Sequence, residues 1–404
     1  MSNAPREIYA DHAATTAPAA EVVAAMRPFL SERFGNASSV HRRGEAARDA
    51  IEAARRQVAA LIGATPEEIV FTASGSEANN LALQGTLAQS GARRRILVSG
   101  VEHPSVLETA RALAAAPGAH ASELTVLPVG AGGVLDPATV ERALGPDVAL
   151  VSVMTANNEI GTIQPIAEIA RLARAAGARM HSDAVQAVGK IPVDVEAPGV
   201  DLLSLAGHKF HGPLGAAALY VRRRTRLTPL VFGGHQERSR RAGTENLPAI
   251  VGLGVACERA ARVLASDAPR RIAALGDRLV AGLLARIPDT HLNGDRERRL
   301  PGLVNVRFAG VDGEAVLHEL DMEGITISTG SACSAATPGP SHVLMALGLR
   351  PEDAHASVRF SLGEEADELD VERILATTSG VVARLRALHA GTPDAATRVA
   401  GAGA

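Results

Sequence analysis

Short apolar runs that suit β-strands alternate with segments of helical periodicity through the first two thirds of the chain. Val148–Met154 is apolar apart from one serine, and Ile166–Ala176 follows it with helical spacing. Strands that alternate with helices of about 10–15 residues form βαβ units, which build a largely parallel sheet with helices on both faces. The sequence therefore predicts an α/β fold.

The elements expected in this part follow one another without an internal repeat. The strands are Ile69–Thr72, Ile96–Ser99, Leu124–Val129, Val148–Met154, Arg179–Ser182, Asp201–Leu205 and Ala216–Val221. The helices are Glu45–Ile62, Glu77–Leu87, Ser105–Ala115, Pro137–Leu144 and Ile166–Ala176.

Past residue 256 the pattern changes to a long helical stretch, Ala260–Ile287, with one break near Asp267–Pro269. The strands Val304–Phe308, Ile325–Ser328 and Val358–Ser361 and the helices Glu314–Leu320, His342–Leu347 and Val371–Leu388 come after it. A chain of 404 residues can hold about two to three domains. We expect a large domain at residues 16–258 and a smaller α+β domain formed by residues 1–15 and 259–389. Residues 390–404 have no periodicity, so we expect a disordered tail.

Composition excludes several classes of protein. Two cysteines cannot supply a disulfide framework or a cysteine-based metal cage, so we expect no resident metal. A net charge of −3 and 2% aromatic residues argue against direct binding of nucleic acid. No apolar signal segment and no run of about 18–20 apolar residues is visible. We expect a cytoplasmic protein that does not enter membranes and keeps its thiols reduced.

The chain has only two lysines, and their surroundings differ. Lys209 stands among glycines and histidines directly after the expected strand Asp201–Leu205. Ligands bind at such strand ends in open α/β sheets, although a lysine on a tight turn is the alternative interpretation. Lys190 lies between Gly189 and Ile191, which is typical of an ordinary solvent-facing turn.

Two other segments follow strand ends in the same way. A lysine that binds pyridoxal phosphate needs a carboxylate for the ring nitrogen, and Asp183 is a candidate, with a helix N-cap as its alternative role. The segment Thr72–Glu77 could hold the phosphate with free N–H groups at a helix start, although the same residues form a capping box.

The two cysteines also differ in their surroundings. Cys333 lies in a stretch of small residues, Thr329–Gly339, without a large apolar side chain. An exposed thiol on a mobile loop suits a nucleophile that has to travel. Cys257 stands among Val255, Ala256 and Ala260 on an expected helix, so we assign it to the core.

Taken together, these segments resemble the pyridoxal-phosphate-dependent cysteine desulfurases, the NifS/IscS-like branch of the class V aminotransferase superfamily. The resemblance spans nearly the whole chain and is carried by residues 9–16, Asn157-Asn158-Glu159-Ile160-Gly161, Gly207-His208-Lys209, Arg241-Ala242-Gly243-Thr244, Gly330-Ser331-Ala332-Cys333 and residues 358–363. It implies the fold type I of pyridoxal-phosphate-dependent transferases, a homodimer, L-cysteine as substrate and a sulfur-acceptor protein as partner.

The resemblance also implies a role for each matching residue. Lys209 would form the Schiff base, Asp183 would bind the ring nitrogen, and His103 would stack on the ring and assist proton transfers. Cys333 would attack the substrate sulfur and could serve as a transient iron–sulfur ligand. Other positions would hold the cofactor (Ser74, Gly75, Ser76, Asn157, Gln186, Ala206, Gly207, His208, and Thr244 from the second subunit) or the substrate carboxylate (Asn36 and Arg359).

The sequence departs from the family pattern at two places in the phosphate site. Ala206 replaces the usual serine, and Ser74-Gly75-Ser76 replaces a run that usually begins with glycine and ends with threonine. We interpret Ser74 as a possible substitute for the lost hydroxyl. The tail also lacks similarity to the segment with which some family members dock a scaffold protein, which leaves the acceptor open.

The implied reaction converts L-cysteine to L-alanine and leaves the sulfur on Cys333 as a persulfide. Two alternatives stay open: a selenocysteine lyase or another pyridoxal-phosphate-dependent C–S lyase or aminotransferase, and a non-catalytic sulfur-transfer scaffold. The destination of the sulfur is also open among iron–sulfur clusters, thiolated tRNA, DNA phosphorothioation and cofactor synthesis.

Overall fold

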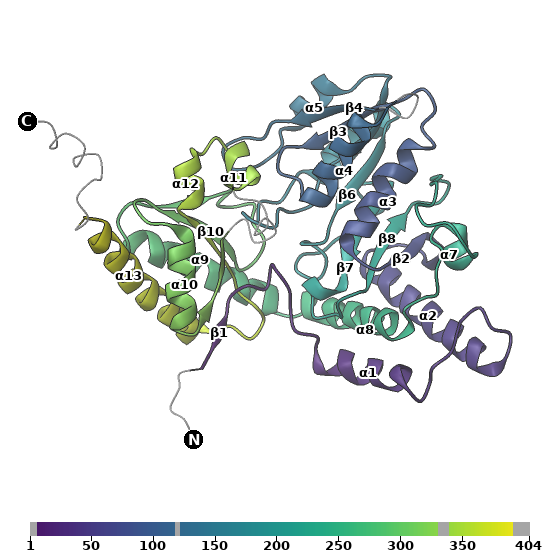
Figure 1. The fold of residues 1–404 in the computed structure, drawn as a ribbon, viewed down its shortest axis with the longest axis horizontal. Helices are drawn as coiled ribbons and strands as arrows, with labels where there is room; N and C mark the ends of the chain where they lie inside the picture. Colours follow the sequence, from purple (N-terminus) through teal and green to yellow (C-terminus); the bar gives the residue numbers. More distant parts are fainter. Residues whose placement is uncertain (1–5, 118–121, 330–338, 391–404) are drawn as a thin grey trace, which may run out of the picture.

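The fold is described from a computed structural model, which covers residues 6–117, 122–329 and 339–390. The chain forms a larger and a smaller lobe that lie side by side (Figure 1). The larger lobe is built on a seven-stranded sheet in the order β2-β8-β7-β6-β5-β3-β4. Strand β8 is antiparallel to both of its neighbours, and the other adjacent pairs are parallel. The mostly parallel α/β sheet predicted from the sequence is confirmed.

The strands of this sheet are β2 (Ile69–Thr72), β3 (Arg95–Ser99), β4 (Glu123–Leu127), β5 (Val148–Ser152), β6 (Arg179–Asp183), β7 (Leu202–Ala206) and β8 (Ala217–Val221). The helices of the larger lobe are α1 (Ala20–Leu30), α2 (Arg42–Leu61), η1 (Pro66–Glu68), α3 (Gly75–Leu87), α4 (Pro104–Ala115), α5 (Pro137–Ala143), α6 (Ile166–Ala175), η3 (Gly207–Lys209), α7 (Gln236–Ser239) and α8 (Leu247–Leu264).

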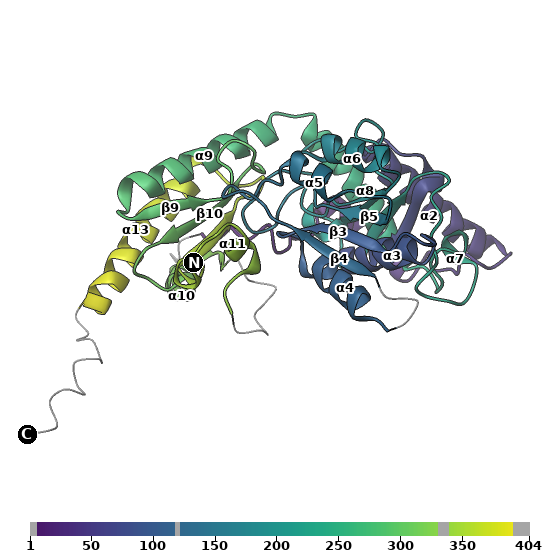
Figure 2. The same ribbon diagram turned by 90° about the horizontal axis from the view of Figure 1, so that it is seen from above.

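Helices cover both faces of the sheet because its strands are apolar on both sides. Successive side chains of a strand point to opposite faces. Ile69 and Phe71 accordingly pack in one core cluster with α2, α6 and α8, whereas Val70 between them packs in another with α3 and α4. Figure 2 shows these two helical layers on opposite sides of the strands. The sheet is thereby enclosed, and its strand ends are left as the place for a site.

The smaller lobe has an antiparallel sheet in the order β12-β13-β10-β9, with its own core against α9, α10 and α13. Its elements are β1 (Ile8–Tyr9), α9 (Ala268–Arg286), β9 (Thr290–Asn293), β10 (Leu303–Phe308), α10 (Gly313–Met322), β11 (Ile325–Thr326), β12 (Ser328–Thr329), α11 (His342–Ala346), α12 (Pro351–His355), β13 (Ser357–Ser361) and α13 (Glu368–Ala390). The N-terminal strand β1 pairs with β11, which ties the start of the chain to this lobe.

Some element boundaries differ from those expected. The break expected near Asp267 is confirmed, since it separates α8 from α9. The first of these helices begins earlier than expected, at Leu247, because the Asn246 side chain caps it by accepting from the Ala249 N–H. It runs across the domain boundary expected after residue 258, and the division into domains stays a prediction. The expected strand Ile325–Ser328 is two short strands in different sheets. Helix α1, which buries only Val22 and Phe29, was not anticipated.

Residues 391–404 of the expected tail lie outside the described residues, whereas Ala390 ends α13. Across the described part of the chain, we find no helix with the length and apolar character needed to cross a bilayer.

Candidate active site

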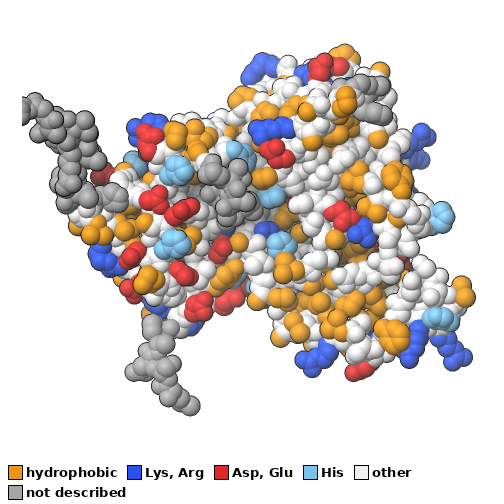
Figure 3. Space-filling model, viewed as in Figure 1, with side chains coloured by type: hydrophobic (Ala, Val, Ile, Leu, Met, Phe, Trp, Pro, Cys, Tyr) orange, Lys and Arg blue, Asp and Glu red, His pale blue; other side chains and the backbone are white. Residues whose placement is uncertain are grey.

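A cavity of about 740 Å³ opens at the carboxyl ends of the parallel strands, and the surface is hollowed between the lobes (Figure 3). The ends of β5, β6 and β7 and the starts of α3 and α4 surround it, and β13 contributes from the smaller lobe. Its lining consists of Ala13, Ala14, Ser74, Gly75, Ser76, Asn79, Asn80, His103, Pro104, Ser105, Glu108, Thr109, Met154, Asn158, Asp183, Val185, Gln186, Ala206, His208, Lys209 and Arg359.

Lys209 lies at the end of the short helix η3 that follows β7. Its Nζ donates to the carbonyl oxygens of Ala13 and Ala14, at 2.8 and 2.7 Å. The neighbouring His208 approaches Thr15 Oγ1 through its Nδ1 at 3.1 Å. Burial lowers the pKa of His208 to about 4, and the charges of Lys209 and Lys190 act in the same direction. The imidazole of His208 is therefore neutral at neutral pH.

Asp183 is buried at the end of β6, as its position after an apolar strand predicted. Its Oδ2 accepts from Asn79 Nδ2 at 2.7 Å, and its Oδ1 accepts from the Val185 N–H at 3.0 Å. The same Asn79 amide group also donates to Ser105 Oγ at 2.8 Å. Asn79 thus fixes the carboxylate from α3, and the second contact links it to α4.

The start of α3 lies at the edge of the cavity, where the free N–H groups of a helix N-terminus suit an anion. Ser74 is the N-cap, and its Oγ accepts from the Glu77 N–H at 3.1 Å. A Cβ at Gly75 would lie 2.8 Å from a Val185 methyl group, so a side chain there would crowd the wall of the cavity. Ser74 does cap the helix, but the reciprocal bond of the expected capping box differs, since Glu77 Oε2 accepts from the Ala73 N–H at 2.8 Å. The hydroxyl hydrogen of Ser74 can still be donated because the bond to Glu77 uses only a lone pair.

His103 is the N-cap of α4 and also lines the cavity. Its Nδ1 accepts from the Ser105 N–H at 3.1 Å, which places the proton of the neutral ring on Nε2. Burial lowers the pKa of His103; Asp183 opposes this shift, and the charges of Lys209 and His342 add to it. The ring is therefore neutral at neutral pH.

Arg359 extends into the cavity from β13. Its Nη2 donates to Asp11 Oδ1 at 2.6 Å and its Nη1 to the Asn158 carbonyl oxygen at 2.9 Å. Its buried Nε has no partner among the described residues. The guanidinium is thus held in place, and its remaining N–H groups can still donate to a molecule in the cavity.

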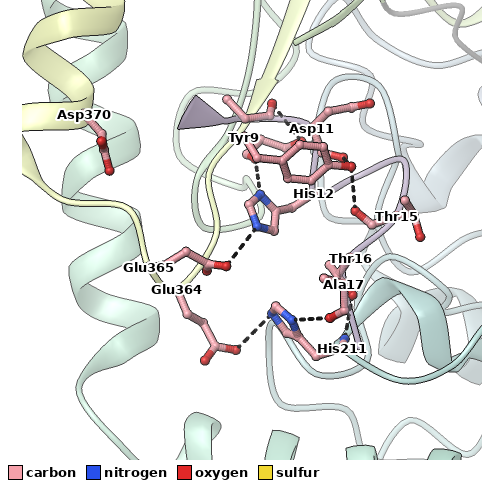
Figure 4. Close-up of polar contacts among 12 residues, drawn as sticks. Tyr9, Asp11, His12, Thr15, Thr16, Ala17, His211, Glu364, Glu365 and Asp370 are labelled. Atoms are coloured by element: carbon pink, nitrogen blue, oxygen red, sulfur yellow. Dashed lines mark hydrogen bonds and ion pairs between the residues drawn. The ribbon is translucent and has the colours of Figure 1, made fainter. Parts of the chain in front are cut away.

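The N-terminal segment that supplies the Ala13 and Ala14 carbonyls is tied down on both sides (Figure 4). His12 Nδ1 lies 3.1 Å from the Ser361 carbonyl oxygen, and His211 Nδ1 lies 3.0 Å from that of Ala17. The second ring nitrogens of these histidines face Glu365 and Glu364, at 3.7 and 3.6 Å. Both lobes therefore position the carbonyl groups that Lys209 contacts.

Most of the residues predicted for the site lie together in this cavity: Ser74, Gly75, Ser76, His103, Asp183, Gln186, Ala206, His208, Lys209 and Arg359. Asn36, Asn157, Gly207 and Thr244 are not among the described residues that line it. Asn36 is exposed and its Oδ1 accepts from the Ser38 N–H, and Thr244 is exposed as well. Cys333 lies outside the described residues.

Asn157 lies beside the cavity but is not among the described residues that line it, and its contact with the cofactor stays a prediction. It is fully buried, and its Nδ2 donates to the Val101 carbonyl oxygen at 2.8 Å. Its Oδ1 accepts from the N–H groups of Glu159 and Ile160. Both ends of this amide therefore fix the turn beside the cavity instead of facing into it.

The interpretation of Lys190 as a solvent-facing turn residue is wrong. It does lie in a turn, but its Nζ donates to Gln186 Oε1 at 2.7 Å. It lines a second cavity together with Lys209, because the turn after β6 folds back under η3. The assignment of Cys257 to the core is confirmed, since it is fully buried in the main cluster. Burial raises the pKa of its thiol far above the ordinary value, which keeps the thiol protonated.

Sequence reasoning missed several residues that shape the site, among them Asn79, Ser105 and Asp11. Asn79 follows Gly75 by one helical turn, so the spacing alone places it on the face of α3 that Gly75 presents. The contact of Asp11 with Arg359 joins residues 348 positions apart and has no local signal in the sequence.

Comparison with known proteins agrees with this geometry. The family model for aminotransferase class-V matches residues 8–374. The cysteine desulfurase IscS of Dictyoglomus turgidum is 46% identical over 385 residues, which cover 95% of this chain and 96% of that protein. The solved structure of a NifS-like protein has a TM-score of 0.87 at 34% identity and covers 94% of this chain and 100% of its own. That of SspA in complex with cysteine has a TM-score of 0.77 at 36% identity, covering 88% and 98%.

These matches span nearly the full length of the chain and include its mostly parallel sheet. This chain therefore belongs to the aminotransferase class-V family, and within that family it is a NifS/IscS-like cysteine desulfurase with the fold type I of pyridoxal-phosphate enzymes.

Proposed function

We propose that this enzyme binds pyridoxal 5′-phosphate in the cavity described above and converts L-cysteine to L-alanine, with the sulfur retained on Cys333 as a persulfide. Enzymes of this family depend on that cofactor. The observation that supports the proposal most is that the amine of Lys209, the carboxylate of Asp183 and the start of α3 converge on one cavity. The related SspA structure contains cysteine, which supports L-cysteine as the substrate.

The residues present fit the cofactor chemically. The buried Asp183 carboxylate, already fixed by Asn79, suits a protonated ring nitrogen. The N-cap Ser74 with Gly75, Ser76 and His208 offers N–H and O–H donors for a phosphate group. The buried Oδ1 of Asn79 has no partner among the described residues, which leaves it as an acceptor beside the same carboxylate.

When bound, pyridoxal phosphate supplies an electron sink that makes the Cα–H of an attached amino acid acidic. Lys209 would bind the cofactor covalently through its aldehyde, and once released its free amine would move the Cα proton. Asp183 would hold the proton at the ring nitrogen. His103 is neutral because burial lowers its pKa, so it would stack on the ring without adding a charge and assist proton transfer.

Arg359 would bind the substrate carboxylate through a charge-assisted pair, since it is fixed by Asp11 and keeps a buried Nε without a partner among the described residues. The Cys333 thiolate would then attack the substrate sulfur. The S–S bond of the persulfide would form as the Cβ–S bond breaks; the bound cofactor would supply the place for the electron pair of that bond, and protonation would complete alanine. A reducing compartment such as the cytoplasm would keep the Cys333 thiol reduced and available for this attack.

We also propose that the enzyme is a homodimer in which Thr244 completes the phosphate site of the partner subunit. Thr244 is exposed and does not line the described cavity of its own chain. Exposed apolar side chains lie along α1 and the segment after it, namely Val23, Leu30, Phe34 and Val40. Figure 3 shows hydrophobic side chains gathered on this lobe. Because exposed apolar patches mark interaction sites, this surface supports a dimer interface in which a second copy of the chain covers it.

The test is to purify the protein and measure its visible absorbance, alanine release and sulfide release. We expect a yellow chromophore that borohydride removes, and equal amounts of alanine and sulfur from cysteine with a reductant present. A colourless protein would overturn the proposal and favour a non-catalytic scaffold. Full sulfur release by Cys333→Ser would instead indicate a lyase that does not need the thiol. Trapping of mixed disulfides through Cys333 would identify the acceptor protein.

A further inference from the structure

The amine of Lys190 is bonded inside the protein, next to the site but not in it. Its Nζ donates to Gln186 Oε1 at 2.7 Å. Lys190 shares a second cavity with Lys209, but it is not among the described residues that line the larger cavity. Gln186 does line the larger cavity. Lys190 can therefore act on the chemistry there through the contact with Gln186 or through its charge, which also lowers the pKa of His208.

The contact with Lys190 decides which way the Gln186 amide points. An ammonium group has only donors, so it pairs with the amide oxygen and not with the amide NH2 group. The NH2 group then faces the opposite way, and Nε2 donates to the Ala13 carbonyl oxygen at 2.8 Å. A rotation of the amide by 180° would place two donors together at Lys190 and two oxygens together at Ala13. Both hydrogen bonds would be lost.

The Ala13 carbonyl oxygen also accepts from Lys209 Nζ, at 2.8 Å. The two lysines are thus joined through one amide and one carbonyl group. The donor end of Gln186 lies at the point where Lys209 places its nitrogen, which is where a cofactor bound to that nitrogen would begin.

We propose that Lys190 is a positioning residue that holds Gln186 with its NH2 group toward Lys209, so that this group serves as a fixed donor to the cofactor. The inference rests on the proposed function, since it assigns the cofactor to the cavity. It gives Lys190 a role through Gln186 and no contact with the reacting atoms.

A purely stabilising role does not explain this lysine. The charged and titratable groups around it are Lys209, Arg359 and His208, and no carboxylate pairs with Lys190 in the described part of the chain. Burial, together with the charges of Lys209 and Arg359, lowers the pKa of Lys190 to about 7. A half-buried ammonium that is paired with no carboxylate among the described residues adds no ion pair to the fold, so its presence is better explained by what it does to Gln186.

The test uses the holoenzyme and follows the visible absorbance of the lysine-bound cofactor against pH. The family resemblance implies that Gln186 bonds the phenolic oxygen of the cofactor or a neighbouring ring atom, and loss of a donor at the phenolic oxygen should raise the pH midpoint. We expect Lys190→Met to raise it by about one unit, a tenfold change in proton affinity. Lys190→Arg keeps a donor toward Oε1 and should return the midpoint toward that of the wild type. Wild-type protein without the chromophore would reject the proposed function itself.

A double-mutant cycle with Gln186→Leu separates positioning from simple charge. If Lys190 acts through the amide, Lys190→Met should not shift the midpoint further in the Gln186→Leu background. An equal shift in both backgrounds would overturn the inference. Arg93→Met is the matched control, because it removes a half-buried cation that bonds the Val148 and Ala176 carbonyl oxygens. If Arg93→Met and Lys190→Met lower the melting temperature equally and neither variant shifts the pH midpoint of the cofactor absorbance, the role of Lys190 is only structural.

Discussion

Arg359 Nη2 and Asp11 Oδ1 lie 2.6 Å apart and join the last strand of the smaller lobe to the N-terminal segment of the chain. The side chain of Arg359 is only 3% exposed, and that of Asp11 is 15% exposed. A buried ion pair of this kind fixes the direction of the guanidinium. It thereby aims the remaining donors of Arg359 into the cavity that the substrate would occupy.

Arg359→Lys should weaken the binding of the substrate carboxylate. Lysine keeps the charge but cannot bond Asp11 and a carboxylate at the same time with a planar fork of donors. We expect KM for cysteine to rise by about 10- to 100-fold, with a smaller change in kcat. Steady-state alanine release measures both constants. Arg307→Lys on the neighbouring strand β10 is the control, because its guanidinium bonds Asn293 away from the cavity. An unchanged KM for Arg359→Lys would contradict the assigned role.

The two cysteines should respond to serine substitution in opposite ways. Cys333→Ser should lower alanine release from cysteine by about 100-fold or more, because a hydroxyl group is a poor substitute for a thiolate nucleophile. Cys257→Ser should keep the activity but lose about 1–3 kcal/mol of unfolding free energy, since it places a hydroxyl group in the apolar core. Alanine assays and urea unfolding of both variants test this pair. Comparable activity losses in both would contradict the separation of roles.

Ser74 should contribute to phosphate binding as well as to the helix cap. Ser74→Ala loses both functions, whereas Ser74→Asp keeps a good N-cap and places a negative charge where the phosphate would lie. We expect both variants to retain cofactor clearly less well than the wild type, and only Ser74→Ala to lose about 1 kcal/mol of stability. Titration of apo-protein with cofactor, together with thermal unfolding, distinguishes the two effects. Unchanged retention in both variants would reject the idea that Ser74 replaces the hydroxyl group lost at Ala206.

Glu102 should make the protein less stable as the pH rises. Burial raises its pKa from 4.5 to about 8, against the bonds from Ser99 and Met154, so the folded protein keeps a proton that the unfolded chain loses. The free energy of unfolding therefore falls between pH 4.5 and 8 on account of this group. The glutamine in Glu102→Gln cannot ionise. The free energy of unfolding of this variant, relative to that of the wild type, should therefore increase across that pH range by roughly 2–4 kcal/mol.

Urea unfolding at pH 5 and at pH 8 measures the change for Glu102→Gln. Glu141→Gln on α5 provides the comparison, because Glu141 is exposed and its loss should leave a profile parallel to that of the wild type. Parallel profiles for Glu102→Gln as well would show that the Glu102 carboxyl is not protonated in the folded protein at neutral pH.

Local patterns were sufficient for the architecture and for the central pair of the site. The strands β2 and β7 lie within one residue of their expected bounds, because apolar runs of this short length that alternate with helical segments favour strands of an enclosed sheet. Asp183 and Lys209 each follow such a strand, and the carboxyl ends of parallel strands meet at one edge. The sequence by itself therefore determined the α/β sheet, the location of the site and the burial of Cys257.

Only the tertiary structure decided how the site residues are held. Lys190 looked like a surface residue because its neighbours Gly189 and Ile191 reveal only a turn, whereas its burial depends on what packs above that turn. Asn157 carried a family motif, yet its amide bonds Val101 across 56 positions of the sequence. The pairing of Asp11 with Arg359 spans 348 positions. Such contacts form only when distant segments fold against each other, so no local periodicity or propensity can encode them.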